Sequence, residues 1–592
     1  MGAALLVAAG SRLPRRAADT LAVAVAALEV GVLALLWTRT GGTGRAVSWV
    51  GGWRPRHGES VGIVLVGERI GIGIALLAAV LVLAVMAYSW RYFSEPPRRH
   101  GGVFPALVLL FEAGMCGFAL TGDLFNAFVF FELMGVAACA LTGYRIEDPR
   151  PLQGALTFGI ANSIGAYLML MGIGLLYART GELGFAQIGQ RLDTHHGGPD
   201  ALVACAAALV VTGLLVKTAA VPFHFWLPDA HTVAPSPVCM LLSGVMVELG
   251  AYGVVRVHTV VFAGAGGVPT ATYEALMVAL GTVTALVGAV MCWQQRHIKR
   301  LLAFSTVAHS GLFLVGLAVL TPESAAGTAV YVAAHAGTKA ALFGLAGVLV
   351  DRFGSVDERE LHGRGRELPW VGAQFAFGGL LLAGLPPFGP GLGKALTEHA
   401  AAQSRPWILV VYVAVSAVTG GAVVRVALRV FWGVGEAPPP GPGEEISGGD
   451  EEPETDEPAR RVPAPMHVVP ALLLAGAAAW GLVPGAAHAL GEAATVFADR
   501  AGYVSAVLGT GPAPPHLLPV PETAWTVPGV LLGVASTGCA LALAGSAVRS
   551  PGWGPRRLLR PLVRLHSGRP GDQVAWLVTG AALIAMIFVA AV

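Results

Sequence analysis

Lysine is almost missing from this chain of 592 residues. Only four lysines stand beside 34 arginines, and three of them, Lys217, Lys339 and Lys394, lie inside long apolar stretches. Arginine keeps its proton under ordinary conditions, whereas a lysine in an apolar environment can lose its proton near neutral pH. The placement favours amines that exchange protons. The alternative is lysines that pack helices together, and the cost of ionisable groups at membrane depth argues against it.

Charge of either sign is also scarce. Charged residues make up 12% of the chain and hydrophobic residues 55%, with a mean hydropathy of +0.67. This composition excludes an ordinary soluble domain. A net charge of +2 gives no indication of a nucleic-acid partner. The sequence therefore predicts a multi-pass protein of a bacterial-type plasma membrane.

Motifs for redox or nucleotide chemistry are missing as well. The six cysteines all lie in apolar segments, and no two of them form a C-x-x-C pair, so neither a disulfide framework nor an iron–sulfur site is indicated. Neither a dinucleotide fingerprint nor a P-loop is apparent. We therefore expect no cofactor, no bound metal, and no redox chemistry in this chain by itself.

Apolar runs long enough to cross a bilayer recur along the whole chain. They predict an all-α, polytopic helix bundle of about 14–16 transmembrane helices. The candidates are 1–10 (a first helix cut short), 18–37, 64–89, 103–121, 123–143, 152–177, 201–227, 237–261, 272–294, 301–320, 326–350, 371–400, 405–432, 465–485, 526–548 and 573–592. Arginine collects in alternate loops, which predicts a cytoplasmic location for those loops and an external N-terminus.

Two of these spans are interrupted beside a lysine. The stretch VTGLLVKTAAVPFHFWLPDAH places Lys217 five residues before a proline, and LAGLPPFGPGLGKALTEH places three prolines before Lys394. Such breaks survive at membrane depth only where protein or water covers the freed backbone groups. The two spans are candidate helices seven and twelve. Because they lie five helices apart, the two units would enter the membrane from opposite sides, which indicates an inverted repeat.

This pattern predicts five regions. They are N-terminal helices at 1–100, a first repeat at 101–262, a second repeat at 270–432, an acidic segment at 433–464, and C-terminal helices at 465–592. The acidic segment is rich in proline and glycine and is expected to be a disordered cytoplasmic loop. A basic stretch at 550–571 is expected to lie on the anionic inner leaflet.

Carboxylates at membrane depth are the expected counterparts of the amines. In FALTGDLFNAFVFFELMG, Glu132 lies in the middle of a span, and Lys217 is its natural partner. Forming and breaking that pair would be a switch that passes a proton along. Asp123, at the outer end of the same span, is favoured as a helix cap over a proton site.

Other ionisable side chains at membrane depth are His224, Glu248, His309, His335 and Lys339, with Glu29 and Glu112 nearer the N-terminus. His335 and Lys339 are four residues apart and share one helix face, which favours a proton relay. For a single histidine such as His224 or His309, a structural hydrogen bond is the favoured alternative. For Glu29 and Glu112, structural pairing and function stay equally open.

Five stretches of the chain carry a family resemblance. They read GDLFNAFVFFELMG, VKTAAVPFHFWLPDAHTVAPSPV, HIKRLLAFSTVAHSG, HAGTKAALFGLAG and AGLPPFGPGLGKAL, and they cover roughly residues 100–430. They resemble the antiporter-like subunits of respiratory complex I, of Mrp-type cation/proton antiporters and of membrane-bound hydrogenases. The Mrp D-type and hydrogenase-4 B-type subunits are the most similar in appearance.

The resemblance implies a fold of two inverted five-helix repeats and a line of proton-carrying residues. In this sequence the line falls on Glu132, Lys217, His335, Lys339 and Lys394. The chain departs from the pattern at two places: Glu248 stands where many members carry lysine, and His297 begins HIKR where DIKR is commoner. The first change reverses a charge in the middle of the relay, and it leaves open which ion is carried.

The leading functional hypothesis is a proton-translocating membrane subunit of a complex I-like, membrane hydrogenase-like or Mrp-like assembly. Other membrane subunits would then be its partners, and any NADH:quinone oxidoreductase or hydrogenase activity would belong to the assembly. The alternative is a stand-alone Na⁺/H⁺ antiporter, with a cation site to which Asp123, Glu132 and Glu248 contribute. A scaffold with an inert channel is disfavoured because lysine is retained at buried positions.

Overall fold

The computed structural model describes most of the chain. The described residues are 1–9, 14–40, 44–55, 62–90, 92, 102–145, 149–194, 198, 200–436, 454, 462–509, 518–549, 565–566 and 569–592. Most of the acidic segment predicted at 433–464 and most of the basic stretch at 550–571 lie outside these residues. The predicted disorder and leaflet contact therefore stay predictions.

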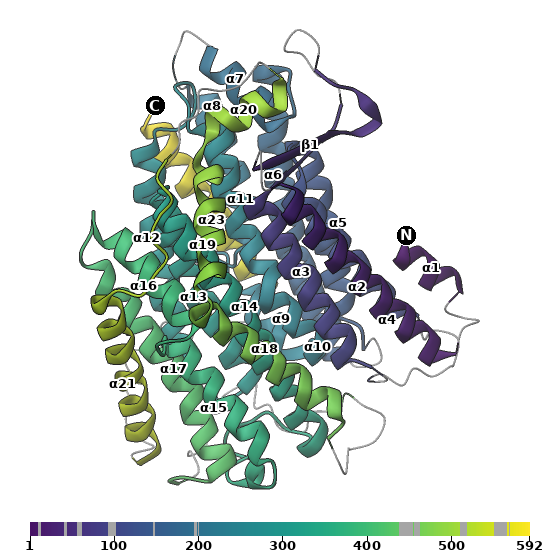
Figure 1. The fold of residues 1–592 in the computed structure, drawn as a ribbon, viewed down its shortest axis with the longest axis vertical. Coiled ribbons are helices and arrows are strands. Elements are labelled where there is room, and N and C mark those ends of the chain that lie inside the picture. The colour runs from purple at the N-terminus through teal and green to yellow at the C-terminus, as the bar shows by residue number, and fades with distance from the viewer. Residues whose placement is uncertain are drawn as a thin grey trace.

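A bundle of long helices dominates the described structure, as the sequence predicts (Figure 1). Thirteen of the described helices are long and apolar enough to cross a membrane. In the first half, the helices are α1 (Gly2–Ala9), α2 (Arg15–Arg39), α3 (Arg69–Tyr88), α4 (Val103–Leu120), α5 (Leu124–Thr142), α6 (Pro149–Thr180), α7 (Phe185–Thr194), α8 (Ala201–Lys217), α9 (Trp226–Val233), α10 (Ser236–Leu241) and α11 (Val247–Val257). The π-helical turn η2 (Leu242–Met246) joins α10 to α11, and a second π-helical turn, η3 (His258–Phe262), continues α11, so that Ser236–Phe262 is one span.

The second half continues the bundle. Its helices are α12 (Thr270–Gln294), α13 (Ile298–Ala318), α14 (Pro322–Phe353), α15 (Pro369–Ala383), α16 (Gly389–Ala402), α17 (Ile408–Trp432), α18 (Ala464–Leu482), α19 (Pro484–Ala498), α20 (Arg500–Leu508), α21 (Val527–Arg549) and α23 (Pro570–Ala590). Two short 3-10 turns, η1 (Val50–Gly52) and η4 (Arg364–Glu367), complete the described elements. Helix α21 packs on α17, whereas α23 packs on α8 and α6.

The expectation of a helix over 64–89 is wrong for its first five residues. These residues form strand β2 (Val64–Glu68), which pairs antiparallel with β1 (Arg45–Trp49). Val64 and Val66 are buried, so the strand covers the end of the bundle with its β-branched side chains. The hairpin, α7 and α20 lie at the same end of the molecule, called here the hairpin end (Figure 1). The sequence patterns did not predict α7, α19 or α20.

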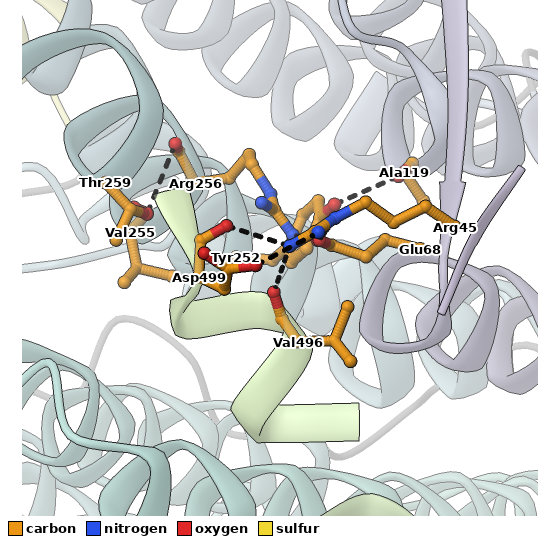
Figure 2. Close-up of polar contacts among 9 residues, drawn as sticks. All are labelled: Arg45, Glu68, Ala119, Tyr252, Val255, Arg256, Thr259, Val496 and Asp499. Atoms are coloured by element: carbon orange, nitrogen blue, oxygen red, sulfur yellow. Dashed lines mark hydrogen bonds and ion pairs between the residues drawn. The ribbon is translucent and has the colours of Figure 1, made fainter. Parts of the chain in front are cut away.

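A buried ionic network fastens the hairpin to the helices (Figure 2). Glu68 accepts from Arg45 at 2.7 Å and also pairs with Arg256 of α11. Arg45 reaches Asp499 as well, at 3.3 Å, and it donates to the backbone carbonyls of Val496 and Asp499. Two arginines and two carboxylates balance their charges, which is what burial of ionised groups demands. We call Arg45, Glu68, Arg256 and Asp499 the hairpin network.

Both predicted interruptions are present as breaks between helices. Helix α8 ends at Lys217, and the chain turns through Thr218 to Phe225 before α9 begins. The second break separates α15 from α16. A lysine at the last residue of α8 places its positive charge at the negative end of the helix dipole, which is a favourable position.

Glycines allow the broken α16 to lie close against α14. A methyl group at Gly393 would overlap the backbone of Tyr331, so the two helices approach closely at this point. This approach matters for function because Tyr331 and the residue after Gly393, Lys394, belong to the site described below.

We expect Gly393→Ala to lower the apparent unfolding temperature of the purified protein, because overpacking costs about 1–3 kcal/mol. Gly174→Ala is the matched control, since nothing lies within 4 Å of a methyl group at that position of α6. Thermal unfolding followed by tryptophan fluorescence would compare the two. Equal unfolding temperatures would contradict the close approach of α14 and α16.

Candidate functional site: a buried line of ionisable side chains

Lys217 is fully buried, and its ammonium lies over the ring of Phe131 at 4.2 Å from the centroid. Its Nζ atom has no hydrogen-bond partner. The sequence predicted a pair with Glu132, and the two groups are close enough to interact electrostatically. A direct ion pair is not made, since the amine rests on the aromatic face instead. Glu132 of α5 is only half-buried.

A second cluster is built around Glu248 at the start of α11. Its Oε1 atom lies 3.2 Å from Nδ1 of His335 on α14, and both side chains are buried. The ring of His335 stacks on that of His309 at 4.8 Å. His309 contacts the Tyr331 hydroxyl at 2.9 Å through Nδ1 and the Thr419 hydroxyl at 3.1 Å through Nε2. Four helices therefore bring one carboxyl, two imidazoles and two hydroxyls together.

Lys394 has a partner on its own helix. Its Nζ atom lies 3.4 Å from Oε2 of Glu398, four residues on, and both side chains are 1% exposed. This partner was missed in the sequence, although GKALTEH shows the spacing that brings two helical side chains together. Tyr331 was missed in the same way, four residues before His335.

Lys339 shares a helix face with His335, as its spacing predicts, but it contacts a different helix. Its ammonium donates to the Ser305 hydroxyl at 2.5 Å and to the Leu302 carbonyl, both on α13. More polar side chains lie near Ser305. The Ser243 hydroxyl is 2.5 Å from the Thr306 hydroxyl and 3.2 Å from Nε2 of His231. Lys339 thus lies beside the Glu248 cluster and joins a separate group of polar side chains.

The two remaining predicted residues lie outside this cluster. Asp123 is the N-cap of α5, where its Oδ1 accepts from the backbone of Asn126 at 2.7 Å, as its position predicts. His224 lies in the first break, and its Nε2 is 2.9 Å from Nε2 of His566. No periodicity or motif in the sequence indicated that His566, far along the chain, would reach this break.

Glu454, like His566, is a site residue that no pattern in the sequence indicated. It belongs to the acidic segment, it is 6% exposed, and it lies beside the start of α10. Its carboxylate accepts from Lys299 at 2.5 Å, from the Tyr92 hydroxyl at 2.7 Å, and from the backbone and hydroxyl of Ser236. It therefore neutralises Lys299 and satisfies a free donor at the start of α10.

These partners decide the ionisation of Glu454. Burial raises the pKa of its carboxyl, but the Lys299 ammonium and the donated hydrogen bonds outweigh burial and hold the pKa below its ordinary value of 4.5. A carboxyl with a depressed pKa contributes stability above its unfolded pKa, and this contribution is lost as the pH falls through the folded pKa.

We expect Glu454→Gln to lower the apparent unfolding temperature at neutral pH, because it removes the carboxylate that lies 2.5 Å from the buried Lys299 ammonium, and breaking such a buried pair costs about 3 kcal/mol. The difference from the wild type should shrink as the pH falls through the depressed pKa of Glu454. Glu451→Gln, which neutralises another acid of the same segment, is the control. An equal effect of both variants at neutral pH, or a difference that grew as the pH fell, would contradict the assignment.

Comparisons with known proteins give a consistent picture. Residues 121–420 match the family described as NADH:quinone oxidoreductase/Mrp antiporter, transmembrane. The N-type subunit of NADH-quinone oxidoreductase from Desulforudis audaxviator is 34% identical over 400 residues, which cover 67% of this chain and 77% of the relative. The D-type subunit of the Na⁺/H⁺ antiporter from Bacillus subtilis is 29% identical over 65% of this chain and 76% of its own length.

A solved structure of similar fold agrees. The Mrp complex from Dietzia contains a chain that superposes with a TM-score of 0.73 at 25% identity, over 86% of this chain and 97% of that chain. The family match spans the breaks, the four buried lysines and the Glu248 cluster described above.

Proposed function

The chain belongs to the NADH:quinone oxidoreductase/Mrp antiporter transmembrane family, and we propose that it translocates protons as one membrane subunit of a larger assembly. Its thirteen candidate spans make it a multi-pass membrane protein, and its bacterial relatives indicate the plasma membrane. Other membrane subunits are its partners, as in the Mrp complex from Dietzia. The observation that carries the proposal is a series of buried contacts. Glu248 contacts His335, the His335 ring stacks on His309, and His309 contacts the Tyr331 hydroxyl.

The contacts suggest an order for proton transfer. Beyond Tyr331, the close packing of α14 on α16 brings the path to Lys394 and Glu398. Lys217 supplies the proton at the other end, from the first break. No contact joins Lys217 to Glu248 among the residues that the structure describes, and we propose that ordered water carries the proton between them. Lys339 lies beside this path and not in it, and its charge influences how readily Glu248 and His335 take up a proton.

Energy for the cycle has to come from outside this chain. Moving one elementary charge against a membrane potential of about 100 mV takes about 2.3 kcal/mol. No cofactor motif in the sequence provides a driving reaction. A partner subunit therefore drives the cycle, or a counter-ion moves down its own gradient. The first possibility suits the relative that is named an NADH-quinone oxidoreductase subunit, and the second suits the one named a Na⁺/H⁺ antiporter subunit.

The amine of Lys217 is the sharpest place to test proton transfer. In reconstituted vesicles that contain the assembly, Lys217→Met should reduce proton flux to below a tenth of the wild-type rate, because the exchanging group is gone. Lys217→Arg keeps the positive charge but does not release a proton, so we expect a similar loss. Glu323→Gln, at an exposed position, is the control and should transport normally.

Two outcomes would count against the relay. Normal flux in Lys217→Met would exclude the amine altogether. Normal flux in Lys217→Arg together with loss in Lys217→Met would show that a fixed charge is sufficient. Assembly has to be confirmed for each variant by co-purification of the partner subunits, because a relay residue affects transport and leaves assembly intact.

Exchange of sodium by the isolated chain is the alternative. It needs a cation site of carboxylate and carbonyl oxygens, to which Asp123, Glu132 and Glu248 would contribute. Asp123 is engaged at its helix cap, apart from Glu248. We expect that this chain, expressed alone in an antiporter-deficient bacterium, does not restore growth in high salt. Restored growth would favour the stand-alone antiporter over the subunit.

A further inference from the structure

Lys339 lies outside the proton path described above, yet a line of polar side chains of its own leads to it. The line begins at His231 in the last turn of α9, continues at Ser243 in the π-helical turn η2, and ends at Thr306 in α13. All three side chains are buried. We call His231, Ser243 and Thr306 the His231 line.

Consecutive members of the line are in hydrogen-bond contact. Nε2 of His231 lies 3.2 Å from Oγ of Ser243, which lies 2.5 Å from Oγ1 of Thr306. Thr306 donates to the Leu302 carbonyl at 3.2 Å, and the same carbonyl accepts from the ammonium of Lys339. The hydroxyl at the end of the line and the buried amine therefore meet at one oxygen atom.

These contacts fix the direction of each donor in the line. Thr306 uses its proton at Leu302, so it accepts from Ser243. Ser243 uses its proton at Thr306, so it accepts from Nε2–H of His231. A neutral imidazole carries one proton, and this tautomer leaves Nδ1 of His231 as an acceptor. That atom is buried and has no hydrogen-bond partner.

Nδ1 of His231 requires an explanation, because buried polar atoms are nearly always paired. Its surroundings indicate where a proton could come from. Lys299 donates to the carbonyl of Ala234, three residues after His231, at 3.3 Å. Its ammonium also pairs with Glu454 at 2.5 Å. Lys299 and Glu454 belong to segments that the sequence predicts to be cytoplasmic, so the line begins near that end of the bundle.

We propose that the His231 line delivers protons from the cytoplasmic end of the bundle to Lys339. A proton binds Nδ1 of His231 while Nε2 releases its own proton to Ser243, which passes its hydroxyl proton to Thr306. The Thr306 hydroxyl then turns from the Leu302 carbonyl to the neutral amine of Lys339. One proton enters the line and one arrives at Nζ, and each intermediate gains one proton and gives one.

Transfer through His231 is concerted. Lys299 of α13 and Lys339 of α14 are close enough to repel a proton on the ring, so a stable imidazolium is disfavoured. The remaining titratable contact is the thiol of Cys239 in α10, which lies 3.6 Å from the His231 carbonyl oxygen. The ring gains a proton at one nitrogen as it loses one from the other. Stacking on Phe343, at 4.5 Å between centroids, holds its orientation.

The line has a consequence for transport, and this consequence rests on the proposed function. The charge of Lys339 influences how readily Glu248 and His335 take up a proton. A branch that sets the protonation of Lys339 therefore controls the path while lying beside it. The alternative is a structural contact that only holds α9, η2 and α13 together.

Two variants of Thr306 separate these roles. Valine has a similar shape and no exchangeable proton, whereas serine keeps the hydroxyl. In inverted membrane vesicles that contain the assembly, we expect Thr306→Val to lower proton flux at least five-fold and Thr306→Ser to keep at least half of the wild-type flux. Thr142→Val is the matched control, because this buried threonine donates to a carbonyl of its own helix, and it should transport normally.

The pH profile distinguishes a proton route from a structural contact. Inverted vesicles expose the cytoplasmic face, so the medium sets the pH from which the line is loaded. With the line interrupted, loading of Lys339 becomes slow and depends on the proton concentration. The loss in Thr306→Val should therefore be at least two-fold smaller at about pH 6 than at about pH 8. A structural defect would lower the flux by the same factor at both values.

His231→Phe repeats the test at the other end of the line. It keeps a ring to stack on Phe343 and removes both nitrogens, so it should show the same loss and the same pH profile as Thr306→Val. Co-purification of the partner subunits identifies a variant that does not assemble, and the other variant then decides.

Three results would overturn the proposal. Normal flux in an assembled Thr306→Val or His231→Phe variant would remove the line from transport. An equal loss in Thr306→Ser would assign the effect to packing. An equal loss at both pH values would assign the line a structural role. None of these results bears on the flux lost in Lys217→Met, so failure of the branch and failure of the proposed function are distinguishable.

Discussion

A charge inside a low-dielectric bundle must find a partner, and this requirement organises much of the described structure. Where the chain buries a permanent charge, as at Arg45 and Arg256, a carboxylate such as Glu68 lies in direct contact. Two of the buried amines have looser contacts: Lys217 rests on an aromatic ring, and Lys394 has one carboxylate at 3.4 Å. Tight pairs hold the fold together, and the looser ones leave a proton free to move.

The sequence was sufficient to predict the bundle, because a long apolar run in a membrane must satisfy its own backbone hydrogen bonds, and a helix does so. A proline break is tolerated only where protein or water covers the backbone groups that it leaves unpaired. Lys217 and Lys394 were found because an ionisable residue in an apolar run is conspicuous. Partners at helical spacing, such as Glu398 and Tyr331, were within reach of the same reasoning. Glu454 and His566 were not, because chain segments far apart in sequence bring them to their partners, and no periodicity records such a meeting.

Glu248 distinguishes this chain from the pattern that its sequence resembles. A lysine at this position would repel a protonated histidine, whereas a carboxylate can pair with one, and Oε1 of Glu248 lies 3.2 Å from Nδ1 of His335. The centre of the line therefore combines an acid with two stacked imidazoles, in contrast to the lysines at either end.

The last two described helices lie on different parts of the bundle. Helix α21 packs on α17, near the second break, and α23 packs on α8, whose final residue opens the first. A methyl group at Gly533 of α21 would meet Pro386 of the second break, and one at Gly580 of α23 would meet Pro222 of the first. Each break is therefore covered by its own C-terminal helix, which shields the backbone groups that the break leaves unpaired.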